Sequence, residues 1–183
     1  MGLFYYKNKK GIEMKKEIDF FSKSEIQYSL KQIEQLLSCG IFHVSNSTNI
    51  LLKAAFIEML ILLRDLMYKS EKFASRIDFA DDIEIDNEKK IRDVSDLIKY
   101  VRDALCHPDS NNHYIEKNNI KSTFNVAFGK CILIKMGDFE QKSKYEDEIC
   151  FFFGSKSIYL KRHIIRAYDE AKLKLEPLIK LNI

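Results

Sequence analysis

The sequence predicts a mainly α fold: a four-helix bundle with an antiparallel β-hairpin or small sheet, at about 123–153, inserted before the last helix. Two observations support this prediction. Apolar residues recur every three or four positions in four separate stretches, which is the period of a helix that buries one side. Between the third and fourth stretches the period changes, and short runs of branched and aromatic residues favour strands.

The size and composition indicate one globular domain that spans 1–183, with residues 1–20 as an N-terminal arm of no clear period. The most apolar stretch, at about 50–67, is interrupted by four charged residues, so it predicts a buried helix rather than a membrane span. The four cysteines lack CxxC spacing, and no apolar signal segment precedes them. We therefore expect reduced thiols, a cytoplasmic protein and no membrane partner.

Two helices are expected in the first half. Ser22 and Glu25 can form a capping box, and the apolar period that follows them ends at Gly40. A polar cluster then supplies N-cap candidates for a longer helix at about 48–69, whose apolar residues lie nearly all round it. That pattern is typical of the central helix of a bundle. The acidic stretch at 70–87 loses the period and is expected to be an extended connection.

The third helix is expected to begin at Glu88 or Val94 and to run to Cys106. It should stop at His107, because Pro108 disfavours the α conformation in the residue before it.

Beyond a turn-rich polar loop, three runs favour antiparallel strands, namely 124–128, 131–136 and 149–153. Gly154 and the serines after it are then expected to cap the last helix, at about 158–174.

The candidate catalytic residues are Arg102, Asp103 and His107, which gather at the end of the third helix. Arg102 and His107 are five residues apart, about 140° around an ideal helix, so they would share no face if the helix continued. The break at Pro108 releases His107 to turn toward a ligand of Arg102. Asp103 is placed to hydrogen-bond the imidazole and fix its tautomer, as acid–base chemistry requires. Arginine adds a rigid, charged fork for two phosphate oxygens.

At the end of the third helix an arginine and a polar residue are followed, after three more residues, by a histidine: Arg102-Asp103-Ala-Leu-Cys-His107. This segment resembles the R-x4-6-H motif of the HEPN domain (higher eukaryotes and prokaryotes nucleotide-binding). The resemblance implies an HEPN-like bundle and a metal-independent endoribonuclease that needs no cofactor. It further implies a homodimer in which two motifs face each other across one composite cleft. His107 would exchange protons with the ribose 2′-OH and the leaving 5′-oxygen, Arg102 would hold the phosphate, and Asp103 would orient His107. The products would end in a 2′,3′-cyclic phosphate.

The resemblance also implies a role as a toxin or a phage-defence effector, with a cognate antitoxin or a regulatory protein as a further partner. The subset of the family that pairs with a nucleotidyltransferase antitoxin has a tyrosine two residues after the histidine. This chain has Asp109 there, so adenylylation at that position is not expected. The strands before the last helix are not a general feature of the family and leave the subfamily open.

A second class of function also fits the motif. A catalytically inactive HEPN-like module that binds nucleotide, RNA or protein could use Arg102 only to bind a phosphate, and would have the same sequence.

Further RNA-binding candidates lie outside the motif. Asn111 and His113 follow it in the same loop, where they either reach RNA or simply form a turn and a surface position. Lys161, Arg162 and Arg166 give the last helix a basic face, which either binds phosphates or is ordinarily solvated. The formal net charge of +3 is too small to indicate a nucleic-acid binder by itself.

No metal site is expected. Cys39, His43, Cys106, His107 and His113 could be assembled into a zinc site, but they lack the two tight ligand pairs typical of structural zinc. Cys106 is also a poor candidate nucleophile for His107, because neighbouring residues at a helix end point their side chains apart.

Overall fold

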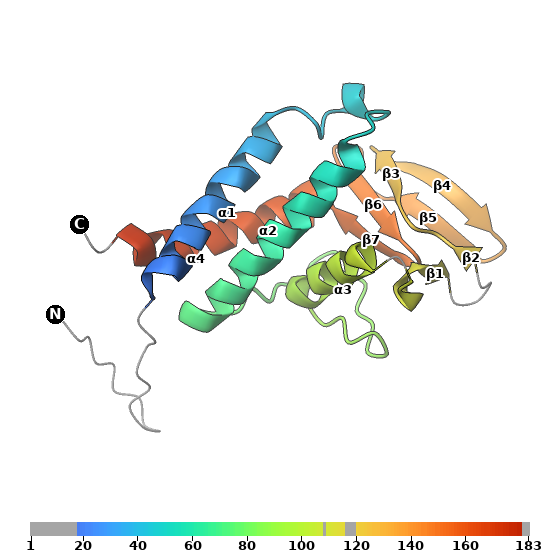
Figure 1. Cartoon of the computed structure of the whole chain (residues 1–183). Helices are drawn as coiled ribbons and strands as arrows, with labels where there is room; N and C mark the ends of the chain where they lie inside the picture. The colour runs from blue at the N-terminus through green and yellow to red at the C-terminus, as the bar shows by residue number, and fades with distance from the viewer. Residues whose placement is uncertain (1–17, 108, 116–119, 181–183) are drawn as a thin grey trace.

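Helix α2 (Leu52–Phe73) lies at the centre of the helical half of the molecule (Figure 1). The computed structural model describes residues 18–107, 109–115 and 120–180. In it, α2 contacts α1 (Phe20–Ser38), α3 (Val94–Cys106) and α4 (Arg166–Lys180). Nine large apolar side chains of α2 are buried, which confirms the predicted buried helix: Leu52, Phe56, Met59, Leu60, Leu62, Leu63, Leu66, Met67 and Phe73.

Three small antiparallel sheets lie beside the helices (Figure 1). The main sheet has the order β3-β6-β7 and is formed by β3 (Asn125–Phe128), β6 (Ile149–Phe153) and β7 (Lys156–Tyr159). Strand β4 (Cys131–Met136) pairs with β5 (Phe139–Ser143), and β1 (Tyr114–Ile115) pairs with β2 (Ile120–Lys121). Short helices complete the chain: η1 (Val44–Asn46), η2 (Asn111–His113) and the π-helix η3 (Leu160–Ile165), which leads into α4.

The predicted class, a mainly α four-helix bundle with an inserted hairpin at about 123–153, was wrong. About 51% of the described residues are helical and 19% lie in strands, so the fold is α+β with a sizeable sheet component. The main sheet also contributes buried side chains to the core that the helices form. Phe151 and Phe153 of β6 are fully buried and stack on Phe56 of α2, with ring centroids 3.9 and 5.8 Å apart.

Three element boundaries also differ from the predictions. Helix α1 begins earlier than the Ser22 capping box, because Asp19 is the N-cap and accepts a hydrogen bond from the Ser22 N–H at 2.9 Å. The polar cluster before α2 forms η1, so α2 begins at Leu52. The predicted last helix at 158–174 is divided among β7, η3 and α4. Most of the predicted arm, residues 1–17, lies outside the described residues.

Gly154 does not cap a helix but forms the turn between β6 and β7, with φ +51°. A Cβ at this position would lie 2.4 Å from the carbonyl oxygen of Asn112 and 3.1 Å from that of Tyr114. The glycine therefore allows the loop after α3 to pack directly against the main sheet.

We expect Gly154→Ala to lower the free energy of unfolding by about 2–4 kcal/mol, because the methyl group meets backbone that cannot move aside cheaply. Gly137→Ala is the matched control: its φ is +57°, but open space surrounds its Cβ position, so only the backbone strain of about 1 kcal/mol should appear. Urea denaturation measures both values. Equal losses in the two variants would contradict the close packing at Gly154.

No helix in the described parts of the chain combines the length and apolar character that crossing a bilayer requires.

Candidate functional site

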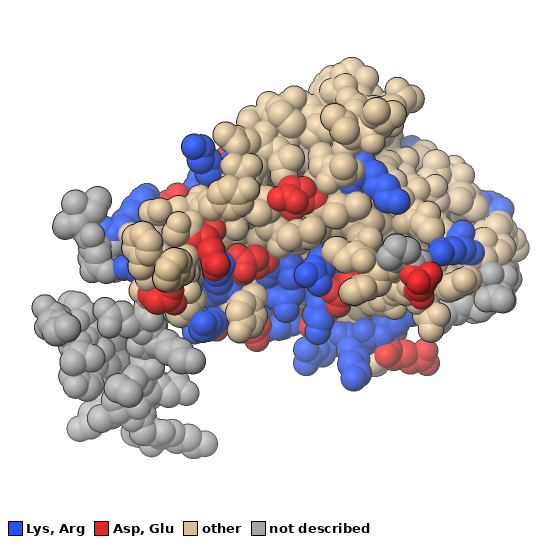
Figure 2. Space-filling model, viewed as in Figure 1, with Lys and Arg blue, Asp and Glu red and all other residues tan. Residues whose placement is uncertain are grey.

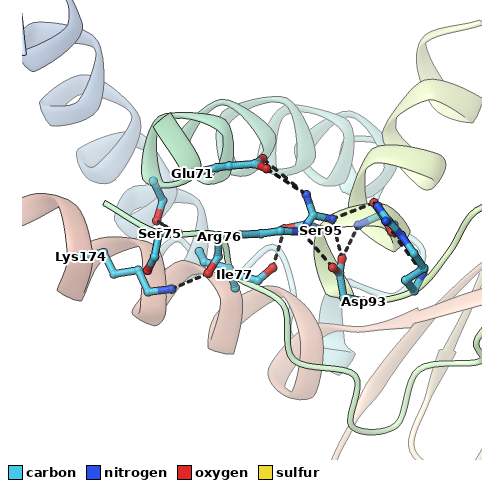
Figure 3. Close-up of polar contacts among 10 residues, drawn as sticks. Glu71, Ser75, Arg76, Ile77, Asp93, Ser95 and Lys174 are labelled. Atoms are coloured by element: carbon cyan, nitrogen blue, oxygen red, sulfur yellow. Dashed lines mark hydrogen bonds and ion pairs between the residues drawn. The ribbon is translucent and has the colours of Figure 1, made fainter. Parts of the chain in front are cut away.

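A polar network fixes the beginning of α3, the helix that carries the candidate motif (Figure 3). Asp93 is the N-cap, and its carboxylate accepts a hydrogen bond from the Asp96 N–H at 2.9 Å. The guanidinium of Arg76 binds both oxygens of Asp93, each at 2.9 Å, and also binds Asp96 at 2.8 Å. These contacts, with the hydrogen bonds to Asp93 as the largest cause, raise the pKa of Arg76 further above its ordinary value. The arginine therefore stays charged.

The chain on both sides of Arg76 is held by neighbouring helices, as the side chains in Figure 3 show. The carbonyl oxygen of Arg76 accepts a hydrogen bond from Lys174 Nζ of α4 at 2.8 Å, and that of Ile77 accepts one from Ser95 Oγ of α3 at 2.6 Å. The first turn of α3 is consequently anchored to the segment that follows α2, and this segment is in turn held by Lys174 of α4.

The other end of α3 agrees with the prediction from Pro108. The helix ends at Cys106, and His107 is extended, with φ −123° and ψ 94°. The His107 N–H still donates to the carbonyl oxygen of Asp103 at 3.2 Å, and its own carbonyl accepts from the Ser110 N–H at 2.9 Å. His107 is exposed, so its imidazole is open to a ligand while its backbone is tethered on both sides.

Arg102 and Asp103 form an ion pair, with 2.8 Å between Arg102 Nη1 and Asp103 Oδ1. Their side chains are 38% and 36% exposed, so the pair lies at the surface and leaves part of the guanidinium accessible. Arg102 Nε is buried and has no hydrogen-bond partner. Within the described residues we find no hydrogen bond from the imidazole of His107 to the Asp103 carboxylate, so the orienting role of Asp103 stays a prediction.

The loop after the motif places Asn111 and His113 differently. Asn111 is exposed, whereas His113 is 4% exposed and packs beside Gly154, with both ring nitrogens buried and unpartnered. His113 in this position is a packing residue that cannot reach RNA without a rearrangement of the loop. The sequence predicted a turn here, but it gave no sign that Gly154 packs against the backbone of this loop.

The three basic candidates near the last helix each pair with an acidic side chain. Lys161 pairs with Asp147 at 3.3 Å, Arg162 with Asp82 at 3.3 Å and Arg166 with Asp81 at 2.9 Å. Arg162 also stacks on the Tyr145 ring at 3.6 Å, and Arg166 on the Phe79 ring at 3.8 Å.

The acidic segment 81–86 is a partner of this basic surface that the sequence reasoning missed. It also supplies Glu84 and Asp86 to the buried amine of Lys156, at 3.0 and 2.8 Å. The sequence could have suggested this pairing only through the opposite charges of segments 81–86 and 161–166, which are far apart in the chain. The RNA-binding role suggested for these basic residues remains a prediction, and the candidate site is therefore built on the end of α3.

His163, the remaining histidine of the basic stretch, is buried, and its Nδ1 accepts a hydrogen bond from the Tyr159 N–H at 3.1 Å. Burial lowers the pKa of His163 to about 4, with the nearby Asp82 carboxylate opposing part of the change. The unfolded chain therefore binds a proton near pH 6.5 that the folded chain takes up only near pH 4. Folding stability should fall as the pH is lowered through this window.

We expect the difference in unfolding free energy between wild type and His163→Asn to change by about 2–3 kcal/mol between pH 7 and pH 4. Asparagine retains an acceptor for the Tyr159 N–H but cannot take up the proton. Denaturation of both proteins at several pH values measures this difference. The titration of carboxylates affects both proteins equally and therefore cancels when the two unfolding free energies are subtracted. A difference that does not vary with pH would contradict the assignment of a neutral, buried His163.

The cysteines and histidines considered for zinc are not brought together. Over the ranges that the structure describes, no group of three or more His, Cys, Asp or Glu is arranged to hold a metal ion. All four cysteines are free thiols. Burial raises the pKa of the Cys150 thiol to about 12, which makes it unreactive near neutral pH.

Comparison of the chain with models of protein families, with curated proteins and with solved structures gave no match.

Proposed function

We propose that the chain is a metal-independent endoribonuclease of the kind that the HEPN resemblance implies. The observation that carries this proposal is the presence of two accessible groups near one helix end: the partly exposed guanidinium of Arg102 on α3, and the exposed His107 just outside the helix. A fixed cation and a group that can accept and donate a proton are used in phosphodiester transesterification.

In the proposed reaction, a histidine takes the proton from the ribose 2′-OH as the 2′-oxygen attacks the phosphorus. The bond from phosphorus to the 5′-oxygen breaks, and the leaving oxygen receives a proton from a second acid. Arg102 neutralises the charge that grows on the non-bridging oxygens. The fragments end in a 2′,3′-cyclic phosphate and a 5′-hydroxyl, and no water molecule is consumed.

Asp103 enters this proposal through Arg102. Its ion pair holds the guanidinium against the surface of α3, which limits the conformations of a long side chain. When RNA binds, the partly exposed guanidinium can contact phosphate on its free side.

A single chain provides one His107, whereas the reaction uses a base and an acid. The proposal therefore includes a homodimer whose two motifs form one cleft, with the base from one copy and the acid from the other. The cellular setting that we propose is the cytoplasm, with RNA as the substrate and an antitoxin or a regulatory protein restraining a toxin or phage-defence effector.

The test is incubation of the purified protein with a mixture of end-labelled RNAs in the presence of EDTA. We expect cleavage that EDTA does not reduce. Intact RNA with a folded, dimeric protein, or cleavage that EDTA abolishes, would overturn the proposal.

The Arg102–Asp103 ion pair also favours a second candidate, a catalytically inactive module that binds a phosphate group. A guanidinium already paired with a carboxylate, and a histidine for which the described part of the chain shows no carboxylate partner, could recognise RNA or a nucleotide without chemistry. This candidate predicts RNA binding that weakens in Arg102→Ala but no fragments under any condition. The same incubation, followed by a filter-binding measurement, separates the two functions.

A further inference from the structure

Two arginines, Arg162 of η3 and Arg166 of α4, have their guanidinium groups held by aromatic rings. The Arg162 guanidinium lies 3.6 Å from the centre of the Tyr145 ring, and that of Arg166 lies 3.8 Å from the centre of the Phe79 ring. A stacked guanidinium turns its face to the ring and keeps the N–H groups at its edge for an oxyanion. The rings therefore orient the two cations independently of the carboxylates that bind them.

The anions that occupy these cations come from one turn, residues 80–83, called the acidic turn below. Asp81 Oδ2 lies 2.9 Å from Arg166 Nη1, and Asp82 Oδ2 lies 3.3 Å from Arg162 Nη1. All four side chains are at the surface, with between 33% and 69% of each exposed. Ion pairs at this exposure contribute little to stability, so a second anion can displace the carboxylates at low cost.

The acidic turn places Asp82 in a backbone conformation that glycine adopts at lower cost. Its φ is +60°, at the third residue of a turn that a hydrogen bond from the Ile83 N–H to the Ala80 carbonyl oxygen closes at 3.2 Å. Glycine is the usual residue where this position has a positive φ. The chain thus bears some backbone strain and presents a carboxylate to Arg162 and to the hydroxyl group of Tyr145.

The chain on both sides of the acidic turn is held more firmly. Before the turn, the Phe79 carbonyl oxygen accepts a hydrogen bond from the Val94 N–H at 2.9 Å. After it, Glu84 and Asp86 bind the buried amine of Lys156, which is only 4% exposed, at 3.0 and 2.8 Å. A movement that frees the arginines is therefore confined to the turn, which can lift while both flanks stay in place.

Other carboxylates also lie beside these cations. Arg166 is 3.4 Å from Glu170 of its own helix, and Lys161 pairs with Asp147. Figure 2 shows the same mixing of charge more widely: on the lower half of this face Lys and Arg lie among Asp and Glu, whereas the surface over the upper ends of α1 and α2 is largely uncharged. An RNA strand that approaches the arginines must therefore displace carboxylates of the protein itself.

We propose that the acidic turn is an autoinhibitory strap. Asp81 and Asp82 occupy the two stacked arginines in place of the phosphates of an RNA strand, and RNA contacts the arginines when the turn lifts away. The inference rests on the proposed function only for RNA as the ligand. It is tested by RNA affinity and not by cleavage.

The first test is the dissociation constant of a labelled single-stranded RNA at 0.15 M salt, measured by filter binding with full-length proteins that also carry His107→Ala, so that the RNA stays intact. Asp81→Asn combined with Asp82→Asn should bind RNA about 3–30-fold more tightly than His107→Ala alone, because asparagine retains the turn but breaks both ion pairs. Glu58→Gln combined with Asp138→Asn is the matched control. Both residues are exposed and lie on α2 and in the turn between β4 and β5, so the same change in net charge should raise the affinity by less than about twofold.

The second test determines whether the gain depends on the arginines. Arg162→Gln combined with Arg166→Gln should weaken RNA binding by less than about threefold while the carboxylates are present, and should cancel the gain when both carboxylates are replaced by asparagine. Asp82→Gly checks the turn by a different route. It removes one carboxylate and relieves the backbone, so it should bind RNA more tightly without a lower free energy of unfolding in urea.

The inference is overturned if replacement of both carboxylates raises RNA affinity no more than the control does, or if the gain survives the loss of both arginines. Poly-glutamate that binds the asparagine variant as tightly as RNA would overturn RNA as the ligand. Cleavage of RNA by the wild type without any gain in the asparagine variant overturns this inference alone. A gain in affinity beside a wild type that leaves RNA intact overturns the proposed catalytic function alone.

Discussion

Replacement of His107 by alanine is expected to lower the rate of RNA cleavage by about 10²–10⁴-fold, the range that a positioned acid–base group contributes. Arg102→Ala should lower it by about 10²–10³-fold, because the charge that develops on the phosphate oxygens loses its fixed cation. Neither change should unfold the protein, since His107 is exposed and Arg102 forms only a surface ion pair.

The measurement is single-turnover cleavage of one labelled RNA by each variant. His43→Ala provides the matched control: His43 is another exposed histidine, which caps η1 rather than ending α3. Its rate should stay within about threefold of the wild type, because a surface substitution away from the site alters little. Arg102→Lys adds a sharper comparison, because lysine retains the charge but loses the planar fork. Equal activity of His107→Ala and His43→Ala would remove His107 from the reaction.

Asp93→Ala is expected to lower the free energy of unfolding by about 3–5 kcal/mol. The substitution removes the N-cap of α3. It also removes both hydrogen bonds from Arg76, whose side chain is 29% exposed, to the Asp93 carboxylate. Asp93→Asn should cost less, because asparagine still caps the helix and accepts one hydrogen bond. Denaturation by urea measures both variants.

The control for this prediction is Lys180→Ala, which breaks an exposed pair with Glu176 and should cost less than about 0.5 kcal/mol. A double-mutant cycle between Arg76→Ala and Asp93→Ala isolates their mutual contribution. If Asp93→Ala costs no more than Lys180→Ala, the network does not anchor α3. In that case the fixed position assumed for the motif at the other end of the helix would have no support.

The sequence allowed α3 to be predicted well because its signals are local. The spacing of its apolar residues and Pro108 after its end predict the last residue correctly, whereas the beginning was left open between Glu88 and Val94 and proved to be Val94. The end of α3 is also where the candidate residues lie, so this part of the site could be located from the sequence.

The class of the fold could not be predicted in the same way. Strand β6 is buried on both faces: Phe151 and Phe153 enter the main core, and Cys150 and Phe152 enter a second cluster. A run that is apolar at every position carries no period, so its contribution to the core was not visible. In the next segment the opposite holds: an apolar period continues through β7 and η3, so the sequence predicts one helix where the structure has a strand followed by a π-helix.

The ion pairs between distant segments could not be predicted from the sequence either. Arg166 and Asp81 are 85 residues apart, and Arg162 and Asp82 are 80 apart, so no local pattern relates them. A basic stretch on a helix is typical of a nucleic-acid surface until its partners in the fold are known. The packing of Gly154 against the backbone of residues 112–114 likewise joins segments that are not neighbours in the sequence.

The most direct measurement for the central claim is the chemical nature of the new 3′ ends that the wild-type protein leaves on RNA in EDTA, determined by mass spectrometry. Attack by the 2′-oxygen predicts fragments that carry a 2′,3′-cyclic phosphate and shift by the mass of one water after acid treatment. Fragments with a 3′-hydroxyl end, or RNA left intact by folded, dimeric protein, would contradict the assignment of Arg102 and His107 to this reaction.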